Sequence, residues 1–502
     1  MLRRFGFAIL LLALGTGTRA FAQTKTLPMP ARVEQAPLVE LPASARPIDL
    51  ETALRLADVA NPQIRLARER VLEAVAARQL AAAQFLPNLN YGTNYDLHLG
   101  NLQDSQGNIV QVNRNSLYVG LGAGAIGAGT VNIPGIVWNA NVADVWYGNL
   151  VSKQVVRQRR FENEAVRNDM LLRVATAYME LLRASGRHAV AAEIRKDAQE
   201  VARVTGNFAK TGQGRQSDAD RAATELQQRD ADLVQAVGDI ELASARLNQL
   251  LSLDPSVKLV PMEQHVVPGA LVPEPIPLPE LIAIAVTQRP ELRERQAAVR
   301  VALLQMRQMK MLPFSPTALV GYSAGAFGGG SDVSAAAGQP RFGDFNNRSD
   351  FDVVLFWTLR NLGVGNAALI NLSRSRMRQS ELRELETFDR VRAEVASARA
   401  RLLARGDQID LYEKAVQSSR TAFKQDLARV FNDKGLPIEL LDSLRLSGRS
   451  RYGYLDSIVD YNRAQFELYV ALGQPPADTL ARPVPLMLGA PEPTPMPLKK
   501  LP

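Results

Sequence analysis

The sequence of 502 residues contains no cysteine. Disulfide bonds, thiolate metal ligands, a cysteine nucleophile and a lipid anchor on an N-terminal cysteine are therefore excluded. Exported proteins are allowed disulfides but do not need them, so the absence of cysteine does not argue against export.

Long apolar runs are also missing after the first 22 residues. A membrane-spanning helix needs about 20 consecutive apolar residues, so none is predicted in the rest of the chain. Any contact with a membrane would have to be made by strands or by a surface helix. Aromatic residues are scarce, at 6%, which fits thin helical rods better than a thick globular core.

Catalytic and cofactor-binding motifs are absent too. The sequence contains no Walker loop, dinucleotide fingerprint or nucleophile elbow. Its three histidines, His98, His188 and His265, are far apart and lack the spacing of metal ligands. We therefore predict no enzyme activity, no cofactor and no metal site.

The charge pattern is that of solvated helix faces. The formal net charge is +8, of which Arg3, Arg4 and Arg19 contribute three. The remaining charges of both signs are spread through helical stretches. A nucleic-acid site would need a basic patch, so no nucleic-acid partner is predicted.

The first 22 residues have the pattern of an export signal. Arg3 and Arg4 precede an apolar stretch at residues 5–14 that is too short to span a bilayer as a helix. Ala20-Phe21-Ala22 gives the small-x-small pattern of a cleavage site. Residues 1–22 are therefore predicted to be a signal peptide.

The rest of the chain reads as two copies of one plan, at 48–275 and 276–473, between Pro-rich segments at 23–47 and 474–502. The opening residues of the copies correspond: Leu50, Leu54, Ala57, Pro62 and Ile64 match Leu278, Ile282, Ala285, Pro290 and Leu292. Each copy continues with a helix, strand-like sequence, a very long helix, a Gly-containing turn and a last helix. Repeats this long indicate a duplicated half rather than a solenoid. The Pro-rich segments are predicted to be extended or disordered.

The long helices carry heptad periodicity. One seam alternates steps of three and four: Phe388, Val391, Val395, Ala398, Leu402, Ile409, Tyr412, Val416, Phe423 and Leu427. The first copy repeats apolar residues every seven positions, at Leu226, Leu233, Ile240 and Leu247. This pattern is typical of coiled coils. A helix from Gly365 to Val430 would be about 100 Å long and would need neighbouring helices along its whole length.

Two stretches alternate as strands with one apolar face. In residues 88–99 the apolar face is predicted to hold Leu89, Tyr91, Tyr95, Leu97 and Leu99. In residues 350–359 it is predicted to hold Phe351, Val353, Leu355, Trp357 and Leu359. A third strand is predicted at 317–327. Such lengths suit strands that face lipid on one side and water on the other, and a soluble half-buried sheet would alternate in the same way.

Each copy is predicted to hold one hairpin, with loops near Gly100–Asn115 and Gly328–Arg348. The second strand of the first copy has three candidates: 116–123, 136–146, or both with a Gly-rich break between them. Four strands cannot enclose a lumen, and an open edge in lipid is forbidden. Three chains sharing one barrel would supply twelve strands.

This combination of features resembles the outer-membrane efflux protein family, the TolC-like channels. The features that carry the resemblance are the Leu-x3-Leu…Asn-Pro opening at Leu50–Pro62, its copy at Leu278–Pro290, the helix–Pro–strand junctions and the Gly turns. The resemblance implies a mainly α fold with a membrane β-barrel part. It implies a homotrimer with a twelve-stranded barrel and an α-helical tunnel.

The resemblance also implies partners: a periplasmic adaptor (membrane fusion) protein, an inner-membrane pump and outer-membrane lipid. The turns at 208–218 and 431–442 would form the periplasmic tip. Candidate docking residues there are Phe208, Gly212, Gly214, Phe431, Gly435 and Pro437. Candidate gate residues are Asp218 and Asp442, each expected beside a helix start. Pro437 stands where the family often has an arginine, and Arg445 stands near the place of a second gate acid.

The predicted function is that of an outer-membrane exit duct for a tripartite efflux system. One alternative is an exit duct for type I protein secretion. Another is a soluble periplasmic coiled-coil adaptor or scaffold, against which the alternating strands argue.

Overall fold

The computed structural model describes residues 46–123, 133–263, 265–273, 276–331, 343–432 and 435–474. These residues belong to one compact unit, Leu41–Pro502. The predicted signal peptide and most of the two predicted Pro-rich segments lie outside the described residues. Their assignments stay predictions.

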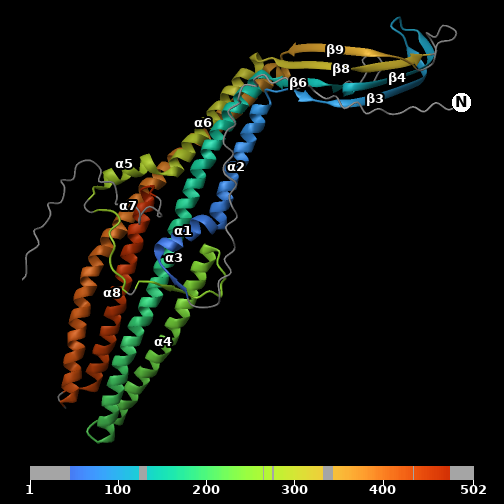
Figure 1. Ribbon diagram of the computed structural model, residues 1–502. Helices are drawn as coiled ribbons and strands as arrows, with labels where there is room; N and C mark the ends of the chain where they lie inside the picture. The colour runs from blue at the N-terminus through green and yellow to red at the C-terminus, as the bar shows by residue number, and fades with distance from the viewer. Residues whose placement is uncertain are drawn as a thin grey trace, which may run out of the picture. The chain divides into compact units, whose positions relative to one another are not determined.

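The helices form two series of the same order (Figure 1). The first is α1 (Leu50–Ala60), α2 (Pro62–Ala83), α3 (Val142–Lys210) and α4 (Gln216–Leu251). The second is α5 (Leu278–Gln288), α6 (Pro290–Met311), α7 (Val364–Phe431) and α8 (Pro437–Ala471). Their lengths are 11, 22, 69 and 36 residues against 11, 22, 68 and 35. This correspondence supports the proposal of two structural repeats at 48–275 and 276–473.

Local sequence explains why the first helix of each series is short. The Asn61 side chain accepts hydrogen bonds from the backbone N–H groups of Gln63 and Ile64 and so caps α2. Pro62 follows at the first helical position, where its missing N–H costs nothing. In the second series Arg289 and Pro290 occupy the corresponding positions. The chain therefore breaks between two helices at each Pro.

The long helices bury part of the seams predicted for them, whereas Tyr412 in the α7 seam is 38% exposed. Helix α3 packs against α4, α7 packs against α8, and α3 also contacts α8. Along α7 the side chains of Val391, Val395, Ala398 and Leu402 are buried. The helix begins and ends within one residue of the predicted bounds of 365 and 430. The prediction of one very long helix with an apolar seam is confirmed.

A small parallel sheet, absent from the predictions, ties the middle of the first series together. Strand β1 (Arg46–Ile48) pairs with β7 (Leu259–Pro261). Ile48 and Leu259 are buried in the same core cluster as Leu54 and Tyr178. Strands of three residues are too short to show periodicity, so they could not be predicted from the sequence.

The larger sheet is antiparallel and lies at one end of the helices (Figure 1). Its strands are β2 (Asn88–Leu89), β3 (Tyr91–Gln103), β4 (Ile109–Ala123), β5 (Ile133–Pro134), β6 (Ile136–Asn141), β8 (Thr317–Ser331) and β9 (Gly343–Phe356). The long strands lie in the order β3-β4-β8-β9, and β6 also pairs with β8 and with β2. The predicted strands at 88–99 and 317–327 are confirmed, and both continue further than predicted.

The first predicted loop is wrong, because the strands run through most of it. Each residue from Leu97 to Gln103 pairs with one from Ile109 to Asn115. Only the short turn around Asp104 remains, where its carboxylate accepts hydrogen bonds from the backbone of Gln106 and Asn108. Polar side chains in this segment do not end the strands, because the hydrogen bonds between strands are made by backbone groups. The second predicted loop is also strand in its described parts, 328–331 and 343–348.

Of the three candidates for the second strand of the first copy, the structure agrees with the one in which both 116–123 and 136–146 contribute strand. Strands β4 and β6 lie on either side of residues 124–132, which are outside the described residues. The predicted range 136–146 is too long, because α3 begins at Val142. The Asn141 side chain caps that helix by accepting hydrogen bonds from the backbone of Ala143 and Asp144.

The last predicted strand is too long at its end. Strand β9 stops at Phe356, so Trp357 and Leu359 lie beyond it. The chain then passes through a 3-10 turn, η2 (Arg360–Gly363), in which Asn361 and Leu362 have positive φ angles of 50° and 56°. Left-handed backbone costs a non-glycine residue about 1–3 kcal/mol.

Candidate functional site

The predicted apolar residues lie on one face of the large sheet. The register pairs Tyr322 with Phe351 and Val320 with Val353, so these side chains point to the same side. The pairing of β8 with β4, and of β4 with β3, places Tyr91, Tyr95 and Leu97 of β3 on this same face. The predicted strand residues on this face, 49–78% exposed, are Leu89, Tyr91, Tyr95, Leu97, Phe351, Val353 and Leu355. Trp357 has the same parity but follows the strand.

The opposite face is rich in glycine and mainly polar, although Val354 and Phe356 at the end of β9 also lie on it and are about half exposed. It carries Asn94 and Asp96 on β3 and Asp350 and Asp352 on β9. Tyr118 lies on this face against Gly325, where an added Cβ would come within 2.9 Å of the tyrosine Cζ. One face of the sheet is thus suited to an apolar medium and the other to water.

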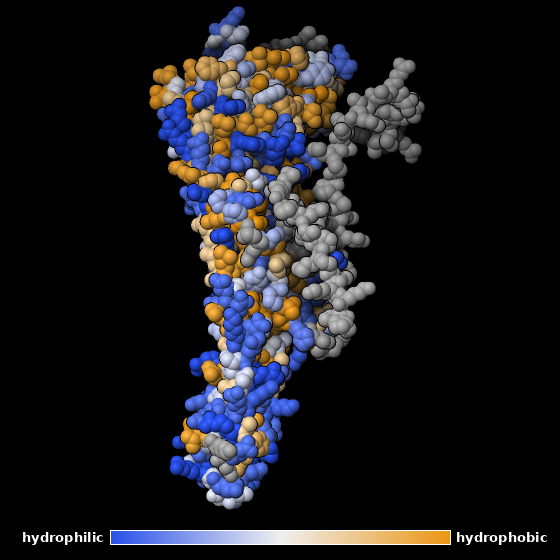
Figure 2. Space-filling view, turned by 90° about the vertical axis from the view of Figure 1, so that its left-hand side faces the viewer, coloured by the Kyte–Doolittle hydropathy of each residue, from blue (hydrophilic) through white to orange (hydrophobic). Residues whose placement is uncertain are grey.

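Both outer strands of this sheet leave backbone groups unpaired. Within the described residues, β3 pairs only with β4 and β9 only with β8. Unpaired strand edges are sites for pairing with another chain. Figure 2 shows hydrophobic residues gathered over the sheet, whereas the helix-turn end is mainly hydrophilic. Among the described residues, no helix is both long and apolar enough to cross a membrane.

The turn between α3 and α4 contains the first set of predicted tip residues. Gly212 adopts a φ of 77°, which favours glycine, and no atom lies within 4 Å of the position of an added Cβ. The backbone N–H groups of Gln213 and Gly214 donate to the Phe208 carbonyl at 3.0 and 2.9 Å. The Phe208 side chain packs against the buried cluster of the long helices. This turn is a glycine-dependent helix end.

The turn between α7 and α8 differs from the first. Pro437 is the first residue of α8, where proline is favoured. An added Cβ at Gly435 would lie 3.0 Å from the Arg429 Cβ, a close approach that favours glycine and that Gly214 shares with the Phe208 Cβ in the first turn. Phe431 is half exposed, in contrast to the partly buried Phe208. Residues 433 and 434 lie outside the described residues.

The two candidate gate acids have different surroundings. Asp218 lies in the first turn of α4, as predicted, and pairs with Arg221 at 3.3 Å. The prediction that Asp442 lies beside a helix start is wrong, because Asp442 is the sixth residue of α8 and the first-turn acid is Glu439. Asp442 is exposed. The helix dipole therefore favours an acid at Asp218, in the first turn of α4, but not at Asp442.

The structure reveals a buried carboxylate that sequence reasoning missed. The Glu225 side chain, 1% exposed, lies on α4 and accepts hydrogen bonds from Arg229 and from Arg445 on α8. Burial raises the pKa of Glu225, but the hydrogen bonds from Arg445 and Arg229 outweigh it and lower the pKa. Arg445, at the place of an expected acid, therefore joins two helices.

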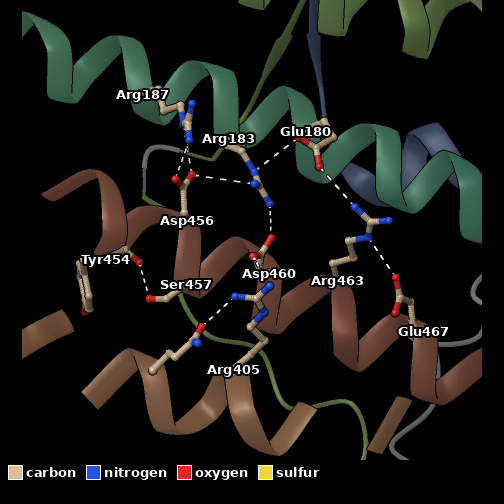
Figure 3. Close-up of polar contacts among 11 residues, drawn as sticks. Glu180, Arg183, Arg187, Arg405, Tyr454, Asp456, Ser457, Asp460, Arg463 and Glu467 are labelled. Carbon is tan, nitrogen blue, oxygen red and sulfur yellow. Dashed lines mark hydrogen bonds and ion pairs between the residues drawn. The ribbon is translucent and has the colours of Figure 1, made fainter. Parts of the chain in front are cut away.

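A network of ion pairs joins α3, α7 and α8 (Figure 3). Asp460 on α8 accepts from Arg183 on α3 and lies 3.3 Å from Arg405 on α7. One turn away, Asp456 accepts from Arg187 at 2.6 Å. These contacts connect the two helical pairs within one chain. Asp456 and Asp460 are four residues apart on α8, so the sequence could have indicated a polar stripe on this helix. It could not have identified the arginines of α3 and α7 that pair with these carboxylates. No group of three metal-ligating side chains occurs among the described residues.

No family model and no curated protein sequence matches the chain. Solved structures do. The outer-membrane channel OprN aligns with 84% of this chain and 89% of its own, at 17% identity and a TM-score of 0.69. The CmeC outer membrane channel of Campylobacter jejuni aligns with 86% and 88%, at 14% identity and a TM-score of 0.67. The outer membrane protein VceC of Vibrio cholerae aligns with 85% and 96%, at 14% identity and a TM-score of 0.66. The chain thus has the fold of TolC-like outer-membrane channels, and the predicted fold class is confirmed.

Proposed function

We propose that the chain is an outer-membrane channel and acts, as a homotrimer, as the exit duct of a tripartite efflux system. The observation that carries this proposal is the large sheet. It has one exposed apolar face and, as far as the described residues show, an outer strand at each edge that pairs with one neighbour, in a fold shared with outer-membrane channels. Lipid tolerates a sheet only when its edges are closed.

The edges support assembly from several copies, and three copies would supply twelve long strands. Strands β3 and β9 of one chain are the only long strands that lack a second neighbour within the described sheet. Pairing β9 of one copy with β3 of the next closes the sheet, and twelve long strands would surround a water-filled lumen. The polar face with Asp350 and Asp352 would line that lumen, as in other barrels.

The helices would extend the lumen into the periplasm of a Gram-negative-type cell. At about 1.5 Å per residue, α3 and α7 each span roughly 100 Å. Their turns would meet a periplasmic adaptor protein, and through it an inner-membrane pump. Exposed apolar side chains at this end, including Phe431, Leu436 and Ile438, supply contact surface. In this role the chain is a passive duct and not an enzyme.

The alternative within the same architecture is an exit duct for type I protein secretion. Deleting the gene separates the two. An efflux duct predicts that the cells accumulate small toxic compounds, whereas a secretion duct predicts that an exported protein stays inside.

Membrane fractionation followed by mass measurement in detergent tests the channel itself. We expect the chain in the outer-membrane fraction, as a trimer that conducts ions in planar bilayers. Recovery as a soluble monomer with intact strands would contradict the proposal and favour a periplasmic scaffold.

A further inference from the structure

A cleft lies between α4, α7 and α8, on the side of α8 that carries Arg445. Its volume is about 520 Å³, which falls within the usual range for sites of small organic ligands, about 300–1,000 Å³. Three arginines and two tyrosines line it: Arg229 on α4, Tyr412 on α7, and Arg445, Arg449 and Tyr452 on α8. Cationic and aromatic side chains of one chain therefore meet in this cleft.

The arginines of the cleft are only partly compensated by acids. Arg445 uses its Nε and Nη2 groups on the Glu225 carboxylate, at 2.9 and 2.8 Å, so its Nη1 group takes no part in this pair. Arg449 is exposed and has no ion pair within the part of the chain that the structure describes. Three guanidinium groups thus share two carboxylates, those of Glu225 and Asp232. Because arginine has five N–H donors and no acceptor, the remaining groups suit an anion.

Asp456 also lines the cleft, but its charge is already balanced. Its carboxylate accepts a hydrogen bond from Arg187 at 2.6 Å (Figure 3). The Arg187 guanidinium also lies 6.0 Å from the centre of the Tyr452 ring, which helps to hold it at this end. Asp456 is two helical turns from Arg449, so the uncompensated positive charge lies at the Arg449 end of the cleft.

The tyrosines supply an aromatic wall. The Tyr412 ring lies against the backbone of α8 at Gly453, where an added Cβ would collide with it. This contact fixes the ring while 38% of the residue stays exposed. Burial raises the pKa of Tyr452, so its hydroxyl stays protonated at neutral pH and can donate a hydrogen bond. An exposed ring held beside guanidinium groups favours a ligand that is both aromatic and anionic.

We propose that this cleft, here called the arginine–tyrosine cleft, binds a small aromatic carboxylate. Arg449 and the Nη1 group of Arg445 hold the carboxylate, and the ring of the ligand packs against Tyr412. A protein partner would need about 800 Å² of surface on each side, so a cleft of this volume fits a small ligand better. The inference goes beyond the proposed function and does not depend on it, because all these side chains belong to one chain.

Fluorine NMR of the full-length protein in non-ionic detergent tests the inference, with 4-fluorobenzoate as the probe and protein-free micelles as the blank. We expect saturable binding with a dissociation constant on the order of a millimolar, as for other ligands of this size. Arg449→Met should weaken binding about tenfold through the loss of a charge-assisted hydrogen bond. Arg449→Lys should keep most of the affinity. The matched control is Arg378→Met, which changes another exposed arginine, on α7 and outside the cleft, and it should bind like the wild type.

Two analogues of the probe test the ligand class. The uncharged 4-fluorobenzyl alcohol and the non-aromatic 4-fluorocyclohexanecarboxylate should both bind more weakly than 4-fluorobenzoate. Tyr412→Leu should remove the preference for benzoate over the cyclohexane acid. Equal binding of the alcohol would overturn the anionic ligand, and equal binding of the cyclohexane acid to the wild type would overturn the aromatic one.

Two further results would overturn the cleft itself. One is an unchanged affinity in Arg449→Met, whose exposed position makes loss of the fold unlikely to mask the result. The other is the absence of saturable binding to the wild type, which includes the case of a neighbouring copy or an acidic protein partner occupying the cleft. Neither result bears on the exit duct, which membrane fractionation and mass measurement test separately.

Discussion

The Glu225 carboxylate on α4 lies 2.8 Å from the Arg445 guanidinium on α8, across 220 positions of sequence. Helices α4 and α8 otherwise make little contact, since each packs mainly against the long helix that precedes it. This buried ion pair joins the two helical pairs near their turns, in addition to the apolar cluster that α3 and α8 form there. Removing one partner of a buried pair leaves a charge without full compensation.

Changing Arg445 to Met should lower the free energy of unfolding by about 1–3 kcal/mol, because Glu225 would keep only its Arg229 bonds. Thermal unfolding of the detergent-solubilised protein, with proteolysis of α4 as a local probe, measures the loss. The matched control is Arg449→Met, one turn along α8 and exposed, which should stay within about 0.5 kcal/mol. Equal losses of stability in the two variants would show that the Glu225–Arg445 pair has no special role in stability.

The same pair predicts a pH dependence. The Arg445 and Arg229 hydrogen bonds lower the pKa of Glu225 more than burial raises it. A lowered pKa in the folded state means that the pair contributes its full stability above the ordinary pKa of a glutamate, about 4.3. That stability is lost as the pH falls through the lowered pKa. Hydrogen exchange of α4 and α8 between about pH 6 and about pH 3 should show this loss in the wild type and not in Glu225→Gln.

The two faces of the sheet should respond differently to charge. Leu97 and Val353 lie on the apolar face and Asn94 on the polar face. Arg at either apolar position should cost about 2–4 kcal/mol near the bilayer midplane, while Asn94→Arg should be tolerated. The yield of assembled trimer in outer membranes measures the difference. Equal losses at all three positions would show that the face assignment is wrong.

Asp442 remains our candidate for the gate, because it is exposed and too far along α8 to act as a cap. Three copies around a threefold axis would form a ring that attracts cations. Asp442→Asn should weaken cation selectivity and block by multivalent cations in planar bilayers, with the trimer intact. Asp218→Asn should have the smaller effect, since Arg221 already pairs with Asp218. Unchanged selectivity in Asp442→Asn would place the gate elsewhere.

Two glycines of α3 should respond oppositely to alanine. An added Cβ at Gly186 would lie 2.8 Å from the Leu455 side chain on α8, whereas Gly206 has no atom within 4 Å. Gly186→Ala should therefore destabilise the protein by about 1–3 kcal/mol through overpacking. Gly206→Ala should stabilise it by about 0.4–1 kcal/mol, because alanine restricts the unfolded chain. Denaturation midpoints of the two variants check both signs.

Regular periodicity explains what the sequence predicted well. The seam of α7 repeats over many turns, so the bounds of the helix follow from where the pattern stops. Alternation along β3 and β9 assigned Tyr95 and Val353 to the apolar face, and the register places them there. Both signals sum over many residues, which makes them robust to single exceptions.

Contacts between residues far apart in the chain explain which features could not be predicted from the sequence. Nothing near Glu225 in sequence marks it as buried, because Arg445 supplies the compensation from another helix. The hairpin beyond Leu99 carries polar side chains, so its strands are visible only in the backbone pairing with β4. Beyond the end of β9 at Phe356 comes the left-handed turn at Asn361 and Leu362, for which the sequence offers only Gly363 as a signal.

The near-equal lengths of α3 and α7, and of α4 and α8, restrict how such a chain can change in evolution. Removing seven residues from α3 and seven from α4 would shorten one helical pair by about 10 Å. The other pair would keep its length, and the two turns would no longer meet a docking partner at the same level. Insertions and deletions in these helices are therefore expected in matched numbers in both halves, and an unmatched one should abolish docking while sparing the sheet.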